Sequence, residues 1–476
     1  MRKIVGMLFT LMIIITPFHS FADKKITTTN QIQSFMEKAL EEYNIPGATL
    51  AVVHKGNIIF QDSWGTMSDG SPVSEDTTFL IGSISKPLTS LAIMELVEEG
   101  EIILDEPIDT YIPWFTYKTD SNKSIRVRHL LEQTSGISTY EGLKVTDQEN
   151  RDENSGITQA VEELSGVELR QSPGKVYEYN SANYLLLGAI IEAVSNQAFS
   201  TYINDNIFAP LDMENTTADY ESAIDKGLVP GYQSWFGQPV KGDGLYDHSG
   251  APYGYMTSTS SDLIKFIEFM LQGGELLNER SLAELQSPPE SGQRYGLGWH
   301  FPRSGNKYPY HTGATTDYRS EIFLIPEEEL GAVLLTNKYH ELEAVAYLSM
   351  MEGIRSIING ENPELTQLSV STQWILLGIV LLLIVFISIS LIRLNRRKVI
   401  NKKVWIFSGI LSILLAVALI PIISFSMGIS WRTFGLFAPD LQFLTSCLTG
   451  VLGAYGIFIF FIIFAKRKNF KNRKET

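Results

Sequence analysis

The sequence places a serine three residues before a lysine, at Ser83 and Lys86, where an apolar helical pattern begins. On a helix these positions share a face, with Cβ atoms roughly 5–6 Å apart, so the lysine can reach the serine hydroxyl. An amine held there can activate the serine as a nucleophile. Serine and lysine are common, however, and the pair alone more often marks an ordinary polar helix start.

A second polar cluster runs from Pro173 to Tyr184 and immediately precedes the apolar residues Leu185–Ile190. Polar groups at the mouth of a buried helix can project into a cleft, and Tyr179 is the candidate among them. A tyrosine acts as a base only if a nearby cation or hydrogen bonds favour its phenolate, and Lys86 is a possible cation. The alternative is that Tyr179 packs in the core and hydrogen-bonds through its hydroxyl.

The third candidate is His311-Thr312-Gly313-Ala314, between the strand-like runs 295–301 and 319–325. A glycine here lets a substrate approach the backbone, and a strand that faces a cleft can offer an N–H group to an oxyanion. The alternative is a plain strand turn. The histidines show neither H-x-x-x-H nor H-E-x-x-H spacing, so we expect no metal site and no cofactor.

The elements that must position these groups form an α/β pattern. We expect a helix at 32–43 and a hairpin of strands 48–54 and 57–64, which turns at Lys55-Gly56 and forms a sheet edge. Residues 79–282 are mostly helical patches and glycine turns, and strand-like runs return at 295–301, 319–325 and 330–336 before a closing helix at 344–358. The expected fold is an antiparallel sheet flanked by helices, with a helical insertion between its strands.

Both ends of the chain indicate a membrane. Residues 1–22 have the basic start, apolar stretch and small residues of a signal peptide; an uncleaved anchor is the alternative. Three apolar stretches, 374–392, 404–427 and 443–465, are long enough to span a bilayer. We therefore expect a large folded domain at 23–358, a stalk at 359–373, an all-α domain of three spans, and a basic tail at 466–476.

Charge sets the expected orientation. Residues 372–476 hold 13 Lys and Arg against two Asp and Glu, whereas the rest of the chain holds 25 against 51. The basic clusters between the first two spans and after the third should be cytoplasmic, which predicts a multi-pass protein of the cell membrane with residues 23–358 on the extracytoplasmic side. The acidic remainder disfavours nucleic acid as a partner. Because Cys447 is the only cysteine, an internal disulfide is excluded.

Taken together, the three motifs resemble those of the class C β-lactamase and penicillin-binding-protein-like serine hydrolases, which carry S-x-x-K, then Y-x-N or Y-x-S, then K-T-G or H-x-G. The resemblance extends to Ile45–Ala48, Ile125–Ile137, Tyr295–Trp299 and Leu335–Asn337. It implies a β-lactamase/transpeptidase-like fold and an acyl-enzyme at Ser83, with Lys86 and Tyr179 moving the proton. It also implies an oxyanion hole at the Ser83 and Ala314 amides, and an acyl pocket lined by Ser181, Thr312 and Gly313.

Two positions depart from the commonest family pattern: Ser181 stands where many members have asparagine, and His311 where β-lactamases and carboxypeptidases usually have lysine. Both changes favour hydrolysis of an amide or ester bond that contains a D-amino acid, in a small peptide-like, ester or cell-wall substrate. The three spans resemble the plan of colibactin-maturing peptidases, and the hydrolase domain also resembles FmtA-type wall esterases. A wall sensor without turnover and a true β-lactamase are the alternatives, and the sequence indicates no protein partner.

Overall fold

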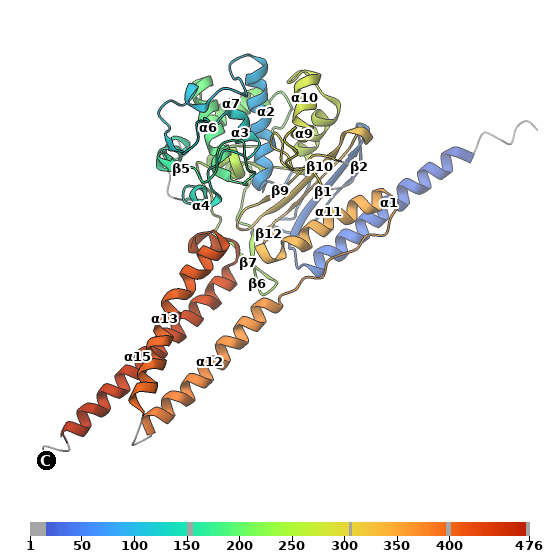
Figure 1. Cartoon of the computed structure of the whole chain (residues 1–476). Coiled ribbons are helices and arrows are strands. Elements are labelled where there is room, and N and C mark those ends of the chain that lie inside the picture. Colours follow the sequence, from blue (N-terminus) through green and yellow to red (C-terminus); the bar gives the residue numbers. More distant parts are fainter. Residues whose placement is uncertain (1–15, 150–155, 304–306, 397–400, 473–476) are drawn as a thin grey trace, which may run out of the picture.

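The computed structural model describes residues 16–149, 156–303, 307–396 and 401–472, and Figure 1 shows two parts. A body that contains the β-sheets and most of the short helices stands at one end of three long helices. The expected signal peptide lies mostly outside the described residues, as do the last residues of the expected basic tail. The first described helix, α1 (Thr16–Glu42), crosses the expected cleavage position and ends near the predicted end of the 32–43 helix.

The centre of the body is an antiparallel five-stranded sheet with the order β2-β1-β11-β10-β9. The predicted hairpin forms one edge, where Ala48 pairs with Trp64. On the opposite edge, β9 pairs with β10 so that Ala314 lies across from Arg319. The strands are β1 (Gly47–His54), β2 (Asn57–Gly65), β9 (Tyr310–Ala314), β10 (Arg319–Ile325) and β11 (Leu330–Thr336).

Two helical layers cover this sheet (Figure 1). On one face, α1 and α11 (Ala344–Ile358) bury a core that includes Met36, Leu50 and Met350. The opposite face packs against the helical insertion, whose helices are α2 (Ser85–Glu98), α3 (Val127–Leu131), α4 (Thr139–Gly142), α5 (Gly156–Leu164), α6 (Ser181–Ser195), α7 (Phe199–Ile203), α8 (Tyr220–Asp225), α9 (Ser260–Gln272) and α10 (Glu279–Leu285). The predicted order of sheet, helical insertion and sheet is confirmed.

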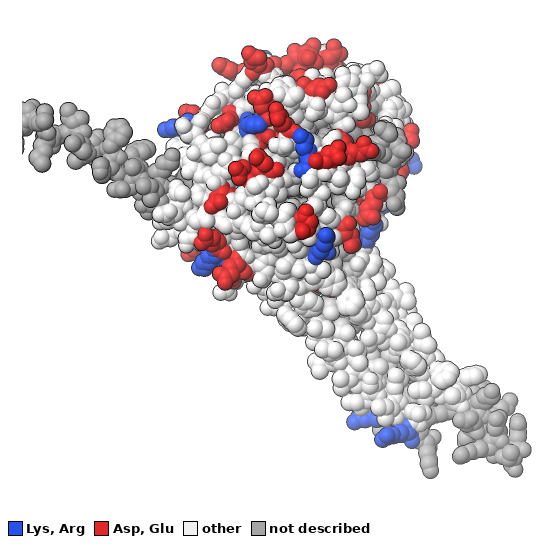
Figure 2. Space-filling view, turned by 180° about the vertical axis from the view of Figure 1, so that it is seen from behind, with Lys and Arg blue, Asp and Glu red and all other residues white. Residues whose placement is uncertain are grey.

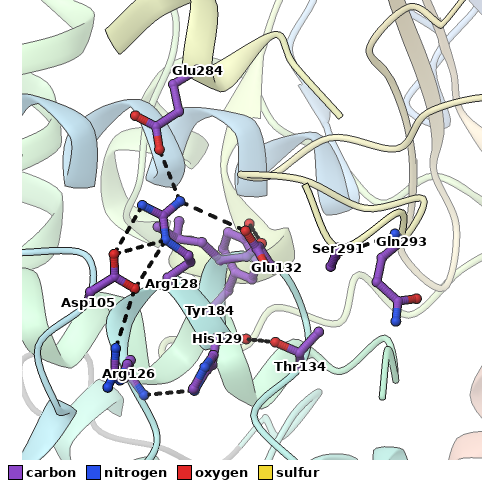
Figure 3. A network of polar contacts seen from close by, with 11 residues as sticks. Asp105, Arg126, Arg128, His129, Glu132, Thr134, Tyr184, Glu284, Ser291 and Gln293 are labelled. Carbon is purple, nitrogen blue, oxygen red and sulfur yellow. Dashed lines mark hydrogen bonds and ion pairs between the residues drawn. The ribbon is translucent and has the colours of Figure 1, made fainter. Parts of the chain in front are cut away.

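Short strands and an ion network complete the body. The strands are β3 (Phe79–Leu80), β4 (Tyr117–Lys118), β5 (Val167–Glu168), β6 (Tyr232–Trp235), β7 (Gln238–Lys241), β8 (Thr257–Ser258) and β12 (Lys338–Tyr339). Figure 3 shows Arg128 of α3 among three carboxylates, at 3.4 Å from Asp105, 3.9 Å from Glu132 and 3.0 Å from Glu284. The network joins α3 to α10 across the surface of the insertion.

One expected strand is wrong. Residues 295–301 do not form a strand, because the chain folds back on itself at Gly298, which has a φ of +89°. The Gly296 amide donates to the Trp299 carbonyl at 2.9 Å, and Tyr295 and His300 meet in a single bridge. The strand beside β10 is β9 instead, so the His311-Thr312-Gly313-Ala314 segment is itself the sheet edge.

Three helices are long and apolar enough to cross a membrane: α12 (Ser371–Arg396), α13 (Lys402–Met427) and α15 (Pro439–Asn472, apolar to Ala465). Figure 2 shows these three helices, here called the shaft, as a surface almost without charged side chains below a body that carries many Asp and Glu side chains. Lys and Arg side chains lie at the end of the shaft that is far from the body. Arg393 and Arg396 close α12 there, and Lys402 and Lys403 open α13. The charge pattern therefore agrees with the three spans expected from the sequence.

The segment between the second and third spans is not a simple loop. Residues 428–442, here called the docking segment, contain the helix α14 (Trp431–Phe437) and pack against the body. The buried Asp440 carboxylate accepts hydrogen bonds from His340 Nε2 at 2.9 Å and from the Phe236 amide at 3.0 Å. Because His340 Nδ1 accepts from the Leu342 amide, the ring proton lies on Nε2 and points at Asp440.

The expected stalk is also in contact with the body. Residues 359–370 form no helix, but Leu365 and Leu368 pack against the α1–α11 core. The Tyr43 hydroxyl donates to the Thr366 carbonyl at 2.7 Å. The segment therefore follows the surface of the body rather than acting as a free spacer.

We expect Asp440→Ala to lower the free energy of unfolding of the full chain by about 3–6 kcal/mol, because a buried donor left without a partner costs about 1–3 kcal/mol. This variant leaves three such donors, His340 Nε2 and the amides of Phe236 and Leu441. The measurement is the thermal unfolding midpoint of the full chain in detergent. The matched control is Asp225→Ala, which removes an exposed carboxylate at the end of α8. Equal midpoints for the two variants would show that the docking contact contributes nothing.

Candidate active site

Ser83 sits in a tight 3-10 turn, Gly82–Ile84, immediately before α2. Gly82 has a φ of +51°, and a Cβ atom at this position would lie 2.3 Å from the Ala314 amide nitrogen. Only glycine therefore lets this turn approach the edge strand β9 so closely. As a result, half-buried Ser83 faces a cavity with the amide of Ala314 beside its own turn.

Lys86 lies one turn further along α2 and is fully buried. Its Nζ atom donates to Ser83 Oγ at 2.9 Å and to the Tyr253 carbonyl at 2.6 Å. Burial lowers the pKa of Lys86 to about 7, and the Asp147 carboxylate opposes this shift. Near neutral pH a large share of Lys86 is therefore a neutral amine in contact with the serine hydroxyl, which is the protonation state of a general base.

Tyr179 enters the site from the chain segment before α6. Its carbonyl accepts from Thr139 Oγ1 at 2.9 Å, and the next amide, of Asn180, donates to Gln133 Oε1 at 2.9 Å. The Asn180 side chain then caps α6 by accepting from the Ala182 amide at 3.0 Å. These bonds fix the backbone that follows Tyr179, and its ring centroid lies 4.9 Å from Lys86 Nζ.

The protonation of Tyr179 does not support the expectation that its phenolate acts as a base together with Lys86. Burial raises the pKa of Tyr179 well above its usual value, and contact with the Ser83 hydroxyl lowers it only in part. The phenol therefore keeps its proton near neutral pH and is suited to donate or relay it. Of the two candidate bases, Lys86 has the pKa that fits proton acceptance at neutral pH.

The four residues of the third motif do not all face the cavity. Thr312 and Ala314 line it, as does Ser181 at the start of α6. Gly313 faces the opposite way, and a Cβ atom there would lie 2.1 Å from the Ile81 carbonyl oxygen. Gly313 thus permits close packing of β9 on the Ser83 turn.

His311 is likewise buried behind the cavity wall. Its Nδ1 lies 2.8 Å from the Thr312 carbonyl, to which it must donate, so Nε2 is free to accept from the Tyr295 hydroxyl at 3.1 Å. Burial lowers the pKa of His311 well below its usual value, and His300 and Lys86 lower it further. His311 is therefore a neutral group that packs behind Tyr179 and Tyr295, and it supplies no positive charge to the cavity surface.

The cavity measures about 550 Å³. It brings together the predicted Ser83, Tyr179, Ser181, Thr312 and Ala314, while Lys86 lies beneath its surface. Its walls also include four residues that sequence reasoning missed: Asp147, His300, Arg319 and Phe437. Arg319 carried a usable signal, since it is a charged residue at the start of a strand that ends in the apolar run 322–325. Asp147 and His300 come from separate loops, and Phe437 is the last residue of α14.

Two carboxyl groups lie beside Tyr253 and Tyr255, which line the cavity next to Lys86. The Tyr255 hydroxyl donates to Asp147 Oδ1 at 2.8 Å, and the Tyr253 hydroxyl donates to Asp247 Oδ2 at 2.6 Å. Arg432, in the docking segment, donates to the Asp147 carbonyl at 2.5 Å. The docking segment thus contacts the loop that carries Asp147, the carboxylate that opposes the lowered pKa of Lys86.

No group of three His, Cys, Asp or Glu side chains within the described ranges could hold a metal ion. The chemistry that the described residues themselves offer is nucleophilic. A hydroxyl lies beside a buried amine and a protonated phenol, and the backbone of an edge strand runs along the same cavity. This arrangement suits attack on a carbonyl carbon and protonation of a leaving group.

Comparisons with known proteins agree with this chemistry. The family model described as Beta-lactamase matches residues 32–351. Protein flp of Staphylococcus aureus strain MW2 is 30% identical over 319 residues, which are 64% of this chain and 62% of that protein. The chain therefore spans about three fifths of the length of the flp relatives that it matches.

Solved structures give the same fold. The octameric penicillin-binding protein homologue from Pyrococcus abyssi has a TM-score of 0.60 and 25% identity, over 71% of this chain and 79% of that one. The D-amino acid amidase from Ochrobactrum anthropi SV3 has a TM-score of 0.56 and 23% identity, over 70% of this chain and 99% of that one. At this level of identity the second likeness concerns the fold alone.

Proposed function

Because the chain belongs to the Beta-lactamase family of serine hydrolases, we propose that it is a membrane-tethered hydrolase that forms an acyl-enzyme at Ser83. The observation that carries this proposal is the 2.9 Å contact between Lys86 Nζ and Ser83 Oγ, combined with a lysine pKa of about 7. A buried amine in this state can take the serine proton without a metal or a cofactor.

In the proposed mechanism, Ser83 Oγ attacks the carbonyl carbon while its proton passes to neutral Lys86. The amides of Ser83 and Ala314 stabilise the oxyanion. When the bond to the leaving group breaks, the Tyr179 phenol protonates the leaving group and recovers a proton from the Lys86 ammonium. Water then attacks the acyl carbon and gives a proton to Lys86. The Lys86 ammonium returns this proton to Ser83 Oγ as the ester bond breaks, which releases the acid and restores the serine hydroxyl and the neutral amine.

For the substrate we propose an amide or ester bond that contains a D-amino acid, in a peptide-like or cell-wall compound. The likeness to the D-amino acid amidase supports this class by analogy of fold. The neutral, buried His311 argues against β-lactam turnover, because it places no cation where lysine usually stands in the β-lactamases. The uncharged shaft and its basic far end support an anchored enzyme with the body on the extracytoplasmic side.

The test of this function is stereoselective turnover. We expect the full chain in nanodiscs to hydrolyse D-alanine p-nitroanilide over many cycles, and the L-enantiomer at least roughly tenfold more slowly, because a pocket that fits one configuration holds the other out of line with Ser83. Nanodiscs without the protein are the control. Equal rates for both enantiomers would reject the D-specific class.

A second candidate, a wall sensor without turnover, is favoured by the hydroxyl of Ser181 in place of an amide. It predicts that Ser83 is acylated once and stays acylated. Rapid hydrolysis of nitrocefin would instead favour a β-lactamase. The same preparation therefore separates the three functions by the number of product molecules per protein and by the substrate that yields them.

A further inference from the structure

Arg319 is a buried cation in the cavity wall that the proposed mechanism does not use. Its side chain is 8% exposed and lines the cavity, and its Nε atom has no hydrogen-bond partner among the residues that the structure describes. A charged group removed from water is costly unless an opposite charge or hydrogen bonds compensate it. This guanidinium is thus poised for a partner that enters the cavity.

The register of the sheet places Arg319 beside the reacting atoms. Arg319 lies directly across from Ala314, so their side chains share one face and their Cβ atoms are roughly 5 Å apart. Thr312 and Ala314 line the cavity from the same face of β9. A substrate whose carbonyl lies between Ser83 and the Ala314 amide therefore extends past Arg319.

Nearby carboxyl groups do not neutralise this cation in full. Glu321 follows two residues later on β10, and burial raises its pKa to about 8, so it is mostly a neutral acid at pH 7. Glu341 lines the cavity but is exposed, and it accepts the Tyr339 hydroxyl at 2.8 Å. The Asp147 carboxylate accepts the Tyr255 hydroxyl and interacts electrostatically with Lys86.

Aromatic side chains hold the guanidinium and shield it. Arg319 Cζ lies 5.8 Å from the centroid of the Tyr339 ring, which is within cation–π range. The Tyr339 ring in turn meets Phe437 of the docking segment edge-on, with centroids 6.2 Å apart. Apolar walls strengthen an ionic contact, because they keep water away from it.

We propose that Arg319 binds a carboxylate of the substrate, in a subsite that Tyr339 and Phe437 complete where the body meets the membrane segment. The planar guanidinium fork matches a carboxylate with two parallel hydrogen bonds. The inference rests on the proposed function at Ser83, and it adds that a free carboxylate close to the scissile bond strengthens substrate binding. Neutral His311 cannot supply this contact.

The test measures how well D-amino-acid compounds protect Ser83 from a fluorophosphonate probe that carries no carboxylate. The compounds are N-acetyl-D-alanine, N-acetyl-D-asparagine and N-acetyl-D-alanyl-D-alanine, each compared with its carboxamide, on the full chain in nanodiscs. For the wild type we expect the carboxylates to protect at concentrations about tenfold to a hundredfold lower, as charge-assisted hydrogen bonds imply. In Arg319→Gln the ratio of the protecting concentration of the carboxamide to that of the carboxylate should fall to near one, while the probe still labels Ser83.

Arg319→Lys should keep part of the preference, because it retains the charge but loses the fork, and it stands in if the glutamine variant does not fold. Arg280→Gln, an exposed arginine on α10, should keep all of it. The proposal is overturned if wild type shows no preference, if no compound protects, or if Arg319→Gln keeps the full ratio. Failure of the probe to label wild-type Ser83 would instead reject the proposed function.

Discussion

Ser83→Ala is expected to abolish acylation of the full chain, with a loss of roughly 10⁴-fold or more, as for other serine hydrolases that lose their nucleophile. The physical reason is that no second hydroxyl takes its place. Ser181 and Thr312 also line the cavity, but only Ser83 lies in contact with the buried amine of Lys86. The measurement is the second-order rate of labelling by a fluorophosphonate probe, followed by mass spectrometry of the labelled peptide.

The matched control is the neighbouring serine. Ser85 also precedes Lys86, but its hydroxyl donates to the Gly82 carbonyl at 2.8 Å and accepts the Met256 amide at 3.3 Å. Ser85→Ala should therefore keep the label on Ser83. A label that persists in Ser83→Ala and disappears in Ser85→Ala would show that Ser85, and not Ser83, is the nucleophile.

The second large effect concerns Lys86. We expect the labelling rate of wild type to rise with pH along a single titration with a midpoint near 7, because only neutral Lys86 accepts the Ser83 proton. Lys86→Met should lower the rate by roughly 10²–10⁴-fold, the usual contribution of a general base, and should remove this pH dependence. Lys38→Met, an exposed amine on α1, is the control that should change neither.

The same residue predicts an effect on stability with a defined sign. Lysine has a usual pKa of 10.5, and burial lowers the pKa of Lys86 to about 7 in the folded chain. Between these values the unfolded chain binds more protons, so the stability of wild type falls as the pH is lowered from about 10 to 7. Methionine carries no such proton.

Relative to wild type, Lys86→Met should therefore gain free energy of unfolding as the pH falls across this range. The trend is independent of the hydrogen bonds that the variant loses, since their loss is the same at each pH. Chemical unfolding at several pH values in detergent measures it. A difference between variant and wild type that stays constant from pH 10 to 7 would show that Lys86 is not a low-pKa amine.

Local sequence patterns predicted much of the fold and the centre of the site. The β-branched runs around Val52 and Val333 and the glycine turn at Gly56 are short-range features, and the sheet and its insertion followed from them. The pair of Ser83 and Lys86 is also local, because its geometry is fixed by one turn of helix. The protonation of Lys86 and Tyr179 was not predictable, since both pKa values depend on burial by distant segments.

The prediction for His311 shows a different limit. Successive residues of a strand point to opposite faces, so His311 and Thr312 could not both reach the same cavity. In the structure Thr312 and Ala314 line the cavity, whereas His311 is buried against Tyr295. Arg319 and Phe437 could not be placed in advance, because one depends on the register of β9 and β10 and the other on the docking of a segment 118 residues away from Arg319 in sequence.

Phe437 makes the cavity depend on both the body and the segment that joins its long helices. A protein whose anchor only holds it in place can exchange that anchor for another without altering its chemistry. Here the turn between α13 and α15 supplies part of the cavity wall, and Asp440 fastens that turn to the body. Exchange of the helices for an unrelated anchor would thus remove one side of the pocket, and recombination between relatives would have to carry both parts together.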